Sequence, residues 1–125
     1  MIDIDSKRKL NLLVHLARID GKFHRAEKAL LREFVNKEGL DVDDFHLLEM
    51  ADEEIGDFHL IDDKKEMLFL ALKLIQADDV IDKKEFTFCK EIAAKLGYNS
   101  LVIDQHAYRE LDRETFDKTV NDWLL

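Results

Sequence analysis

Proline is absent from this chain of 125 residues, and glycine occurs only four times. The four glycines, Gly21, Gly39, Gly56 and Gly97, all fall between segments of helical periodicity, as turns do in an all-helical chain. Cysteine occurs once, as Cys89, so the chain cannot form an internal disulfide. A lone thiol fits a reducing cytoplasm. These scarcities favour an all-α intracellular protein.

Long apolar runs and clusters of basic residues are also missing. No run approaches the ~20 apolar residues of a spanning helix, and residues 1–5 lack the basic start and apolar core of a signal peptide. The formal net charge of −9 argues against nucleic acid and against direct insertion into an anionic membrane. It allows cation binding or a protein partner, or simply gives solubility. We expect one soluble, cytoplasmic domain over residues 1–125.

Residues 67–88 organise the rest of the chain. They read as a nearly all-apolar helix, a short acidic corner and the start of a second helix. The same pattern occurs earlier, so residues 9–45 and 67–103 form two repeat units with a constant offset of 58 (78 − 20). We interpret them as two helix-corner-helix halves packed about a pseudo-two-fold axis. The offset pairs Leu12 with Leu70, Leu16 with Leu74, Asp20 with Asp78, Glu27 with Glu85, Phe34 with Ile92 and Gly39 with Gly97.

The repeat also aligns two polar stripes, which we expect to face water in both halves. Asn11, His15 and Arg18 fall opposite Phe69, Lys73 and Gln76 at helical spacing.

Six or seven helices and no strand are expected over the whole chain. The expected helices begin at a capping Asp5 or Ser6, near Arg25, at Asp41 or Asp43, at Asp62 or Asp63, at Lys83, at Ser100 and at Asp112. Residues 52–63 read as an acidic connector. The last helix carries Phe116, Val120, Trp123 and Leu124 on one face.

Each corner presents an Asp followed seven residues later by a Glu, namely Asp20 with Glu27 and Asp78 with Glu85. A tight corner can bring two carboxylates together, which is costly unless a cation or hydrogen-bond donors neutralise them. The corners are therefore candidate sites for a divalent cation, calcium or magnesium. They can equally be ordinary helix caps, because Asp82 followed by Glu85 has the spacing of a capping box.

The second corner also has the pattern of a partial EF-hand loop. Residues 80–86 resemble the second half of such a loop, with Ile81 at its apolar position and Glu85 at its bidentate position. The first two ligand positions would be Leu74 and Gln76, and in the other half Leu16 and Arg18, so a full calcium loop is excluded in both. Any metal would be held weakly, by few protein oxygens.

The segment ARIDGKFHRAE, residues 17–27, followed by an apolar helix that ends at Gly39, resembles the repeat of the tellurite-resistance TerB-like domains. The resemblance implies an all-α domain of two halves, with acids that bind divalent cations and a role in stress-associated complexes. By position those acids are Asp20, Glu27, Asp78 and Glu85. The second copy has Asp79 where the family usually has Gly. The same repeat resembles a domain found beside J-domains in cochaperones.

No pattern of catalytic residues is visible. The histidines (His15, His24, His46, His59, His106) have no zincin or di-iron spacing, although His24 could add a ligand to the first corner. Cys89 falls on the inward face of its helix, where a thiol is a packing residue. We therefore expect a non-enzymatic domain that binds divalent cations weakly at its corners. The alternative is a protein-interaction or cochaperone-type module that uses an apolar groove between the halves or the acidic connector. An unrecognised hydrolase is a third possibility without a visible nucleophile.

Overall fold

The computed structural model describes residues 4–19, 25–40, 63–77 and 81–125. These residues form six α-helices, one short 3-10 helix and no strand, which confirms the expected all-α fold. The expected helix beginning at Asp41 or Asp43, the connector apart from Asp63, and both Gly21 and Gly56 lie outside the described residues. The elements are α1 (Ile4–Arg18), α2 (Arg25–Lys37), α4 (Lys64–Ile75), α5 (Lys83–Lys95), α6 (Leu101–His106), α7 (Arg113–Thr119) and η2 (Val120–Trp123).

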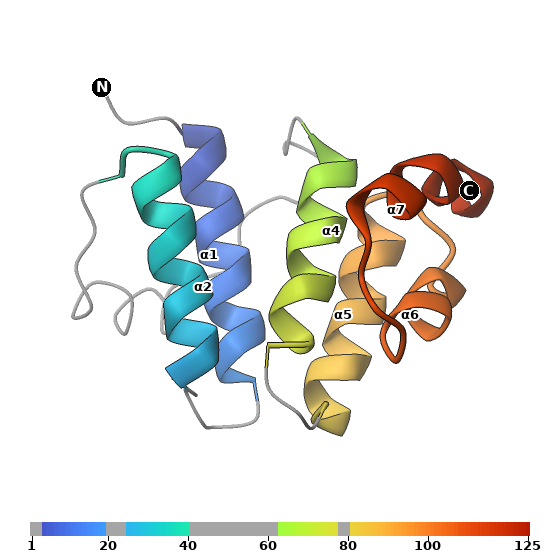
Figure 1. The fold of residues 1–125 in the computed structure, drawn as a ribbon, viewed down its shortest axis with the longest axis horizontal. Helices are drawn as coiled ribbons and strands as arrows, with labels where there is room; N and C mark the ends of the chain where they lie inside the picture. The colour runs from blue at the N-terminus through green and yellow to red at the C-terminus, as the bar shows by residue number, and fades with distance from the viewer. Residues whose placement is uncertain (1–3, 20–24, 41–62, 78–80) are drawn as a thin grey trace.

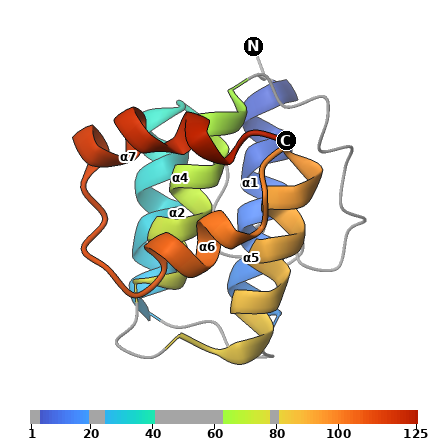
Figure 2. The same cartoon turned by 90° about the vertical axis from the view of Figure 1, so that its right-hand side faces the viewer.

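Two helical pairs stand side by side, and the C-terminal helices cover one flank (Figure 1). α1 packs against α2, and α4 packs against both α1 and α5. Seen from the side, α6 lies on α5 and α7 crosses near the upper end of α4 (Figure 2). α4 is therefore the central helix. None of the described helices has the length and apolar character needed to cross a membrane.

The apolar core lies where α1, α4 and α5 meet. The fully buried helix faces come from the leucine-rich stretches that the periodicity placed inward. Leu16 and Leu74, paired by the repeat, are both buried, as are Phe34 and Ile92. The largest fully buried side chains are Phe116, Leu10, Leu12, Leu16, Leu31, Met67, Leu68, Leu72, Ile75, Ile92 and Ile103.

Three helices begin at the aspartates expected to cap them. The side chains of Asp63, Asp82 and Asp112 accept hydrogen bonds from the backbone N–H of Glu66, Lys84 and Thr115, at 3.0, 2.8 and 3.1 Å.

Gly39 and Gly97 end α2 and α5 in the same way. Their φ angles are +65° and +93°, in the left-handed region that glycine adopts without steric cost. In each case the next residue, Leu40 or Tyr98, donates to a carbonyl five residues back, at 3.0 and 2.9 Å. Both ends have the bonding of a Schellman motif. The two ends match at the expected offset, whereas the pseudo-two-fold relation of whole halves stays a prediction.

Three helix ends differ from the expectation. Ser100 precedes α6, but its side chain forms no capping hydrogen bond, and Asn99 instead accepts from the N–H of Leu101 at 3.0 Å. α1 begins at Ile4, so Ser6 lies inside the helix; it is buried and donates to the Glu38 carboxylate at 3.1 Å instead of capping. The last helix stops at Thr119 and continues as a 3-10 turn, which changes the period and leaves Leu124 exposed. The expectation that Leu124 lies on the buried face is therefore wrong.

The polar stripes do not both face water. Asn11 on α1 is buried, and His15 and Arg18 are half-buried. On α4, Lys73 is exposed, but Gln76 reaches the end of α6. Helical spacing alone cannot identify which polar face a neighbouring helix covers.

Candidate functional site

The predicted corner acids are only partly described. Glu27 and Glu85 lie in the first turns of α2 and α5, where a carboxylate interacts favourably with the helix dipole. Both are buried, with 1% and 4% of their surface exposed. Asp20, Asp78 and the neighbouring His24 lie outside the described residues. The pairing of each Asp with its Glu therefore stays a prediction.

Clusters of metal-ligating side chains are absent from the described part of the chain. There, no three His, Cys, Asp or Glu residues gather closely enough to hold an ion. Asp20 and Asp78 lie outside that part, so the corner hypothesis stays open.

Cys89 has the environment of a packing residue. Its side chain is fully buried on α5, and burial, with a smaller effect from Glu85, raises the pKa of the thiol well above its ordinary value. A neutral and inaccessible thiol is a poor nucleophile.

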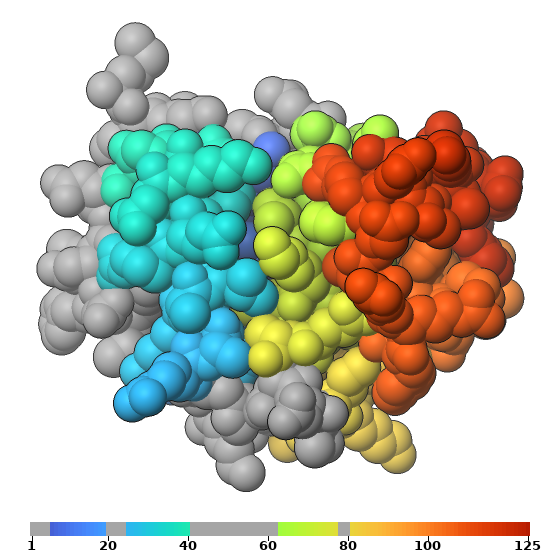
Figure 3. Space-filling model, viewed as in Figure 1, coloured from blue at the N-terminus to red at the C-terminus, as the bar shows by residue number. Residues whose placement is uncertain are grey.

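The most developed concave feature is a groove between α2 and α4, which we call the α2–α4 groove. The space-filling view shows the surface hollowed along the line between these two helices (Figure 3). Its deeper part has a volume of about 130 Å³. The lining of that part is Leu13, Leu30, Leu31, Glu33, Phe34, Lys37, Glu38, Glu66, Phe69, Leu70, Lys73, Leu74 and Arg113.

The floor of the groove is apolar and buried, whereas apolar side chains on its walls are partly open to solvent. Leu31, Phe34 and Leu74 belong to the buried core, and Leu30 and Leu70 are only half-buried on facing walls. Apolar surface left accessible on the walls of a concave site gains free energy when a partner covers it.

A shallower hollow continues the groove toward the start of α2. It shares Leu30, Phe69 and Lys73 with the deeper part, and its volume is about 550 Å³. Its remaining walls are formed by Ala26, Ala29, Gln76, Ala77 and Leu111. The two parts form one elongated site.

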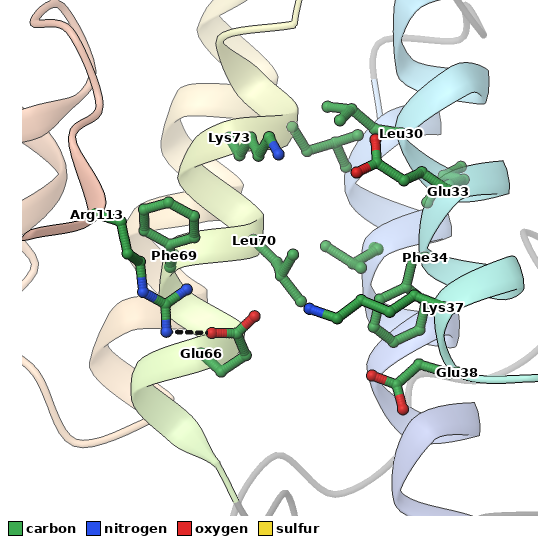
Figure 4. A pocket seen from close by; sticks show the side chains of 13 residues that line it. Leu30, Glu33, Phe34, Lys37, Glu38, Glu66, Phe69, Leu70, Lys73 and Arg113 are labelled. Carbon is green, nitrogen blue, oxygen red and sulfur yellow. Dashed lines mark ion pairs between the residues drawn. The ribbon is translucent and has the colours of Figure 1, made fainter. Parts of the chain in front are cut away.

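Arg113, the first residue of α7, closes the side of the groove away from α2. Its guanidinium pairs with Glu66 on α4 at 2.5 Å and with Asp117 at 3.3 Å. It also lies 4.4 Å from the centre of the Phe69 ring, within range of a cation–π contact. The hydrogen bond to Glu66 raises the pKa of Arg113, so this residue stays charged. Figure 4 shows the pair beside the ring.

Gln76 fixes the segment between α6 and α7 that leads to Arg113. Its side-chain amide donates to the backbone carbonyls of His106, Ala107 and Arg109 at 2.8, 2.9 and 2.9 Å. Edge-on packing of Phe69 against Phe116, with ring centres 5.2 Å apart, holds α7 itself against α4. The third wall of the groove is therefore anchored at both ends.

Lys37 and Lys73 stand on opposite walls at the mouth of the groove. In Figure 4 their side chains extend from α2 and α4 into the opening, with Lys73 above Leu70 and the end of Lys37 below it. Neither forms an ion pair among the described residues. Glu33, which is exposed, also points into the opening. The mouth thus carries charges that are not neutralised locally.

Comparison of this chain with protein-family models, curated proteins and solved structures gives no match. The TerB-like resemblance therefore stays a prediction that rests on the short motif over residues 17–27.

The sequence allows a groove between the halves to be proposed, but it does not identify the residues that line this groove. Leu30 and Leu70 read as ordinary inward positions of their own helices, and nothing in either helix indicates that the other stands too far away to cover them. Lys73 is recognisable only as a polar residue. Arg113, some 40 residues from α4 (113 − 73), gives no signal that it pairs there.

Proposed function

We propose that this chain is a non-enzymatic binding domain that receives an apolar segment of another protein in the α2–α4 groove. The observation that carries the proposal is the partly accessible apolar surface of Leu30 and Leu70 on facing helices, closed on a third side by an anchored arginine. Grooves of this kind typically bind one face of an amphipathic helix. The inert environment of Cys89 argues against a role for this thiol as a nucleophile.

A synthetic helix tests this proposal even though the natural partner is unidentified. The probe is a stapled peptide of about four turns with leucines at i, i+3, i+4, i+7 and i+11 and glutamine at all flanking positions. Binding is measured by fluorescence anisotropy. We expect saturable binding to the wild type.

Two tryptophan variants locate the binding site. Ala29 is exposed at the wall of the groove, and Ala94 is exposed on α5 and does not line it. Ala29→Trp should obstruct the groove and weaken peptide binding about tenfold or more, because each leucine kept out of the groove loses about 1.5 to 3 kcal/mol of burial. Ala94→Trp should leave binding unchanged. Equal effects of the two variants, or no binding to the wild type, would contradict the proposal.

A second candidate function is weak divalent-cation binding at the two corners, as the TerB-like resemblance implies. The matching positions of Glu27 and Glu85, each in the first turn of its helix as the repeat predicts, support it. We propose Asp20 with Glu27, and Asp78 with Glu85, as the ligands of calcium or magnesium. A role in stress-associated or cochaperone-type complexes is compatible with either candidate.

The corner proposal is tested by thermal unfolding at constant ionic strength. Exchanging sodium for calcium or magnesium at a hundredfold excess over Kd should stabilise the wild type by about 2.7 kcal/mol for each corner that binds the ion. The double variant Asp78→Asn, Glu85→Gln should lose the part of this gain that comes from the second corner. If both proteins respond alike, that corner has only a structural role.

A further inference from the structure

We infer that the partner of the α2–α4 groove is an amphipathic helix whose apolar stripe is flanked by carboxylates, one on each side, which bind Lys37 and Lys73. This inference rests on the proposed function and adds the charge of the partner to it. It draws on the length of the groove, on its apolar floor and on the positions of the two lysines.

The length of the groove fits a helix better than a small molecule. The lining residues on α2 run from Ala26 to Glu38, which is about 18 Å at 1.5 Å per residue. That distance corresponds to about three turns of a docked helix. The deeper part, at about 130 Å³, has room for roughly one large apolar side chain, and the shallow part continues past Leu30. A helical partner would place one anchor in the deep part and smaller apolar residues along the remainder.

The two lysines are placed to contact opposite flanks of such a helix. Lys37 projects from α2 and lines only the deep part, whereas Lys73 projects from α4 and lines both parts. In the described part of the chain neither ammonium group has a carboxylate within ion-pair distance. Their long apolar stems can cover the partner while the charged ends reach its polar flanks.

The acidic groups at the groove restrict where the carboxylates of the partner can lie. The charge of Glu66 is compensated by Arg113, whereas Glu38 keeps its charge, because the Ser6 hydroxyl that donates to it is neutral. Glu33 and Glu38 therefore both repel an acidic residue placed directly beside them on the α2 wall. The preferred partner therefore carries its acids toward the two lysines and neutral residues beside Glu33 and Glu38. This pattern gives specificity and orientation more than affinity.

The experiment compares three forms of the stapled leucine-stripe peptide, with glutamate, glutamine or lysine at the two flanking positions. Affinities are measured by anisotropy at 50 and 300 mM NaCl. At low salt we expect the glutamate form to bind the wild type about tenfold more tightly than the lysine form, since attraction at two sites is replaced by repulsion. The difference should shrink at high salt, because exposed charges are screened.

Charge variants of the protein assign the preference to particular residues. Lys37→Gln with Lys73→Gln should remove most of the preference for glutamate, measured as the ratio of the affinities of the glutamate and lysine forms for the same variant. The matched control, Lys83→Gln with Lys84→Gln, removes two exposed charges outside the groove and should leave the preference intact. Glu33→Gln should strengthen binding of the glutamate form.

The outcomes separate this inference from the proposed function. Binding of all three peptides with equal affinity, or a preference that survives loss of Lys37 and Lys73, would overturn the charge assignment and leave the groove as a neutral site. Preference for the lysine form would overturn it as well. Binding of none of the peptides would overturn both proposals.

Discussion

The side-chain amide of Gln76 makes three hydrogen-bond contacts to the segment that leads out of α6. Replacing it with an isosteric carboxylate tests how the C-terminal helices are held. The amide has two N–H groups but contacts three carbonyl oxygens, those of His106, Ala107 and Arg109, so one N–H is shared between two of them. Gln76→Glu removes both donors and points a negative charge at the carbonyl end of α6.

The expected cost is a sum of two physical effects. Two lost hydrogen bonds cost about 1 to 3 kcal/mol, and repulsion between a carboxylate and the negative end of a helix adds about 0.3 to 1 kcal/mol. We expect Gln76→Glu to lower the free energy of unfolding at pH 7 by about 1 to 4 kcal/mol, as measured by urea denaturation. Asn121→Asp adds the same charge at an exposed position and serves as the control.

The pH dependence of the cost distinguishes this mechanism from a general loss of packing. The carbonyl oxygens raise the pKa of the introduced carboxyl in the folded state, so the deficit is greatest at neutral pH and shrinks as the pH falls toward 4 and the carboxyl becomes a donor. A variant as stable as the wild type at pH 7, or a deficit that is the same at pH 4, would refute the assignment of Gln76 as the anchor.

Three further predictions concern the core and its titratable groups. Leu16→Ala and Leu74→Ala should each cost about 2 to 5 kcal/mol through lost burial and a cavity, and a near-zero cost at either in chemical denaturation would contradict the equivalence of the two sites. Cys89 should react slowly with an alkylating reagent in the native protein and quickly in urea; fast native labelling, read by mass spectrometry, would contradict its burial. Burial, with a smaller effect from Arg109, lowers the pKa of His106 below 6.5, so the unfolded state binds the proton first. The free energy of unfolding should therefore fall as the pH drops below 6.5, and His106→Gln should reduce that slope.

Local chemistry predicted most of the helix ends that the structure describes. Asp63, Asp82 and Asp112 cap their helices, and Gly39 and Gly97 end theirs, because capping depends on residues only a few positions apart. These features could be read from the sequence without the tertiary structure.

Tertiary contacts determined what could not be predicted. Ser6 is inside α1 because it reaches Glu38, 32 residues away, and Gln76 is held by α6 rather than by water. Leu124 is exposed because the chain tightens to a 3-10 turn at Val120. In each case a distant or geometric constraint outweighed the local periodicity on which the prediction depended.

The candidate sites also include a part that the sequence predicted and a part that it could not predict. Spacing within each corner predicted a site for Glu27 and Glu85, and the structure places both in buried first turns. The α2–α4 groove depends on the separation of two helices and on Arg113 crossing to Glu66, so no local pattern could identify it.

The central claim is that the α2–α4 groove binds a helix, and residue-specific NMR of the whole chain during titration with the glutamate-flanked peptide tests it most directly. The account predicts that amide shifts concentrate on residues lining the groove, including Leu30, Leu70 and Lys73, and saturate with a single Kd. Shifts concentrated instead on the separate hollow lined by Lys84, Thr87 and Glu91 of α5, or the absence of saturable shifts, would contradict it.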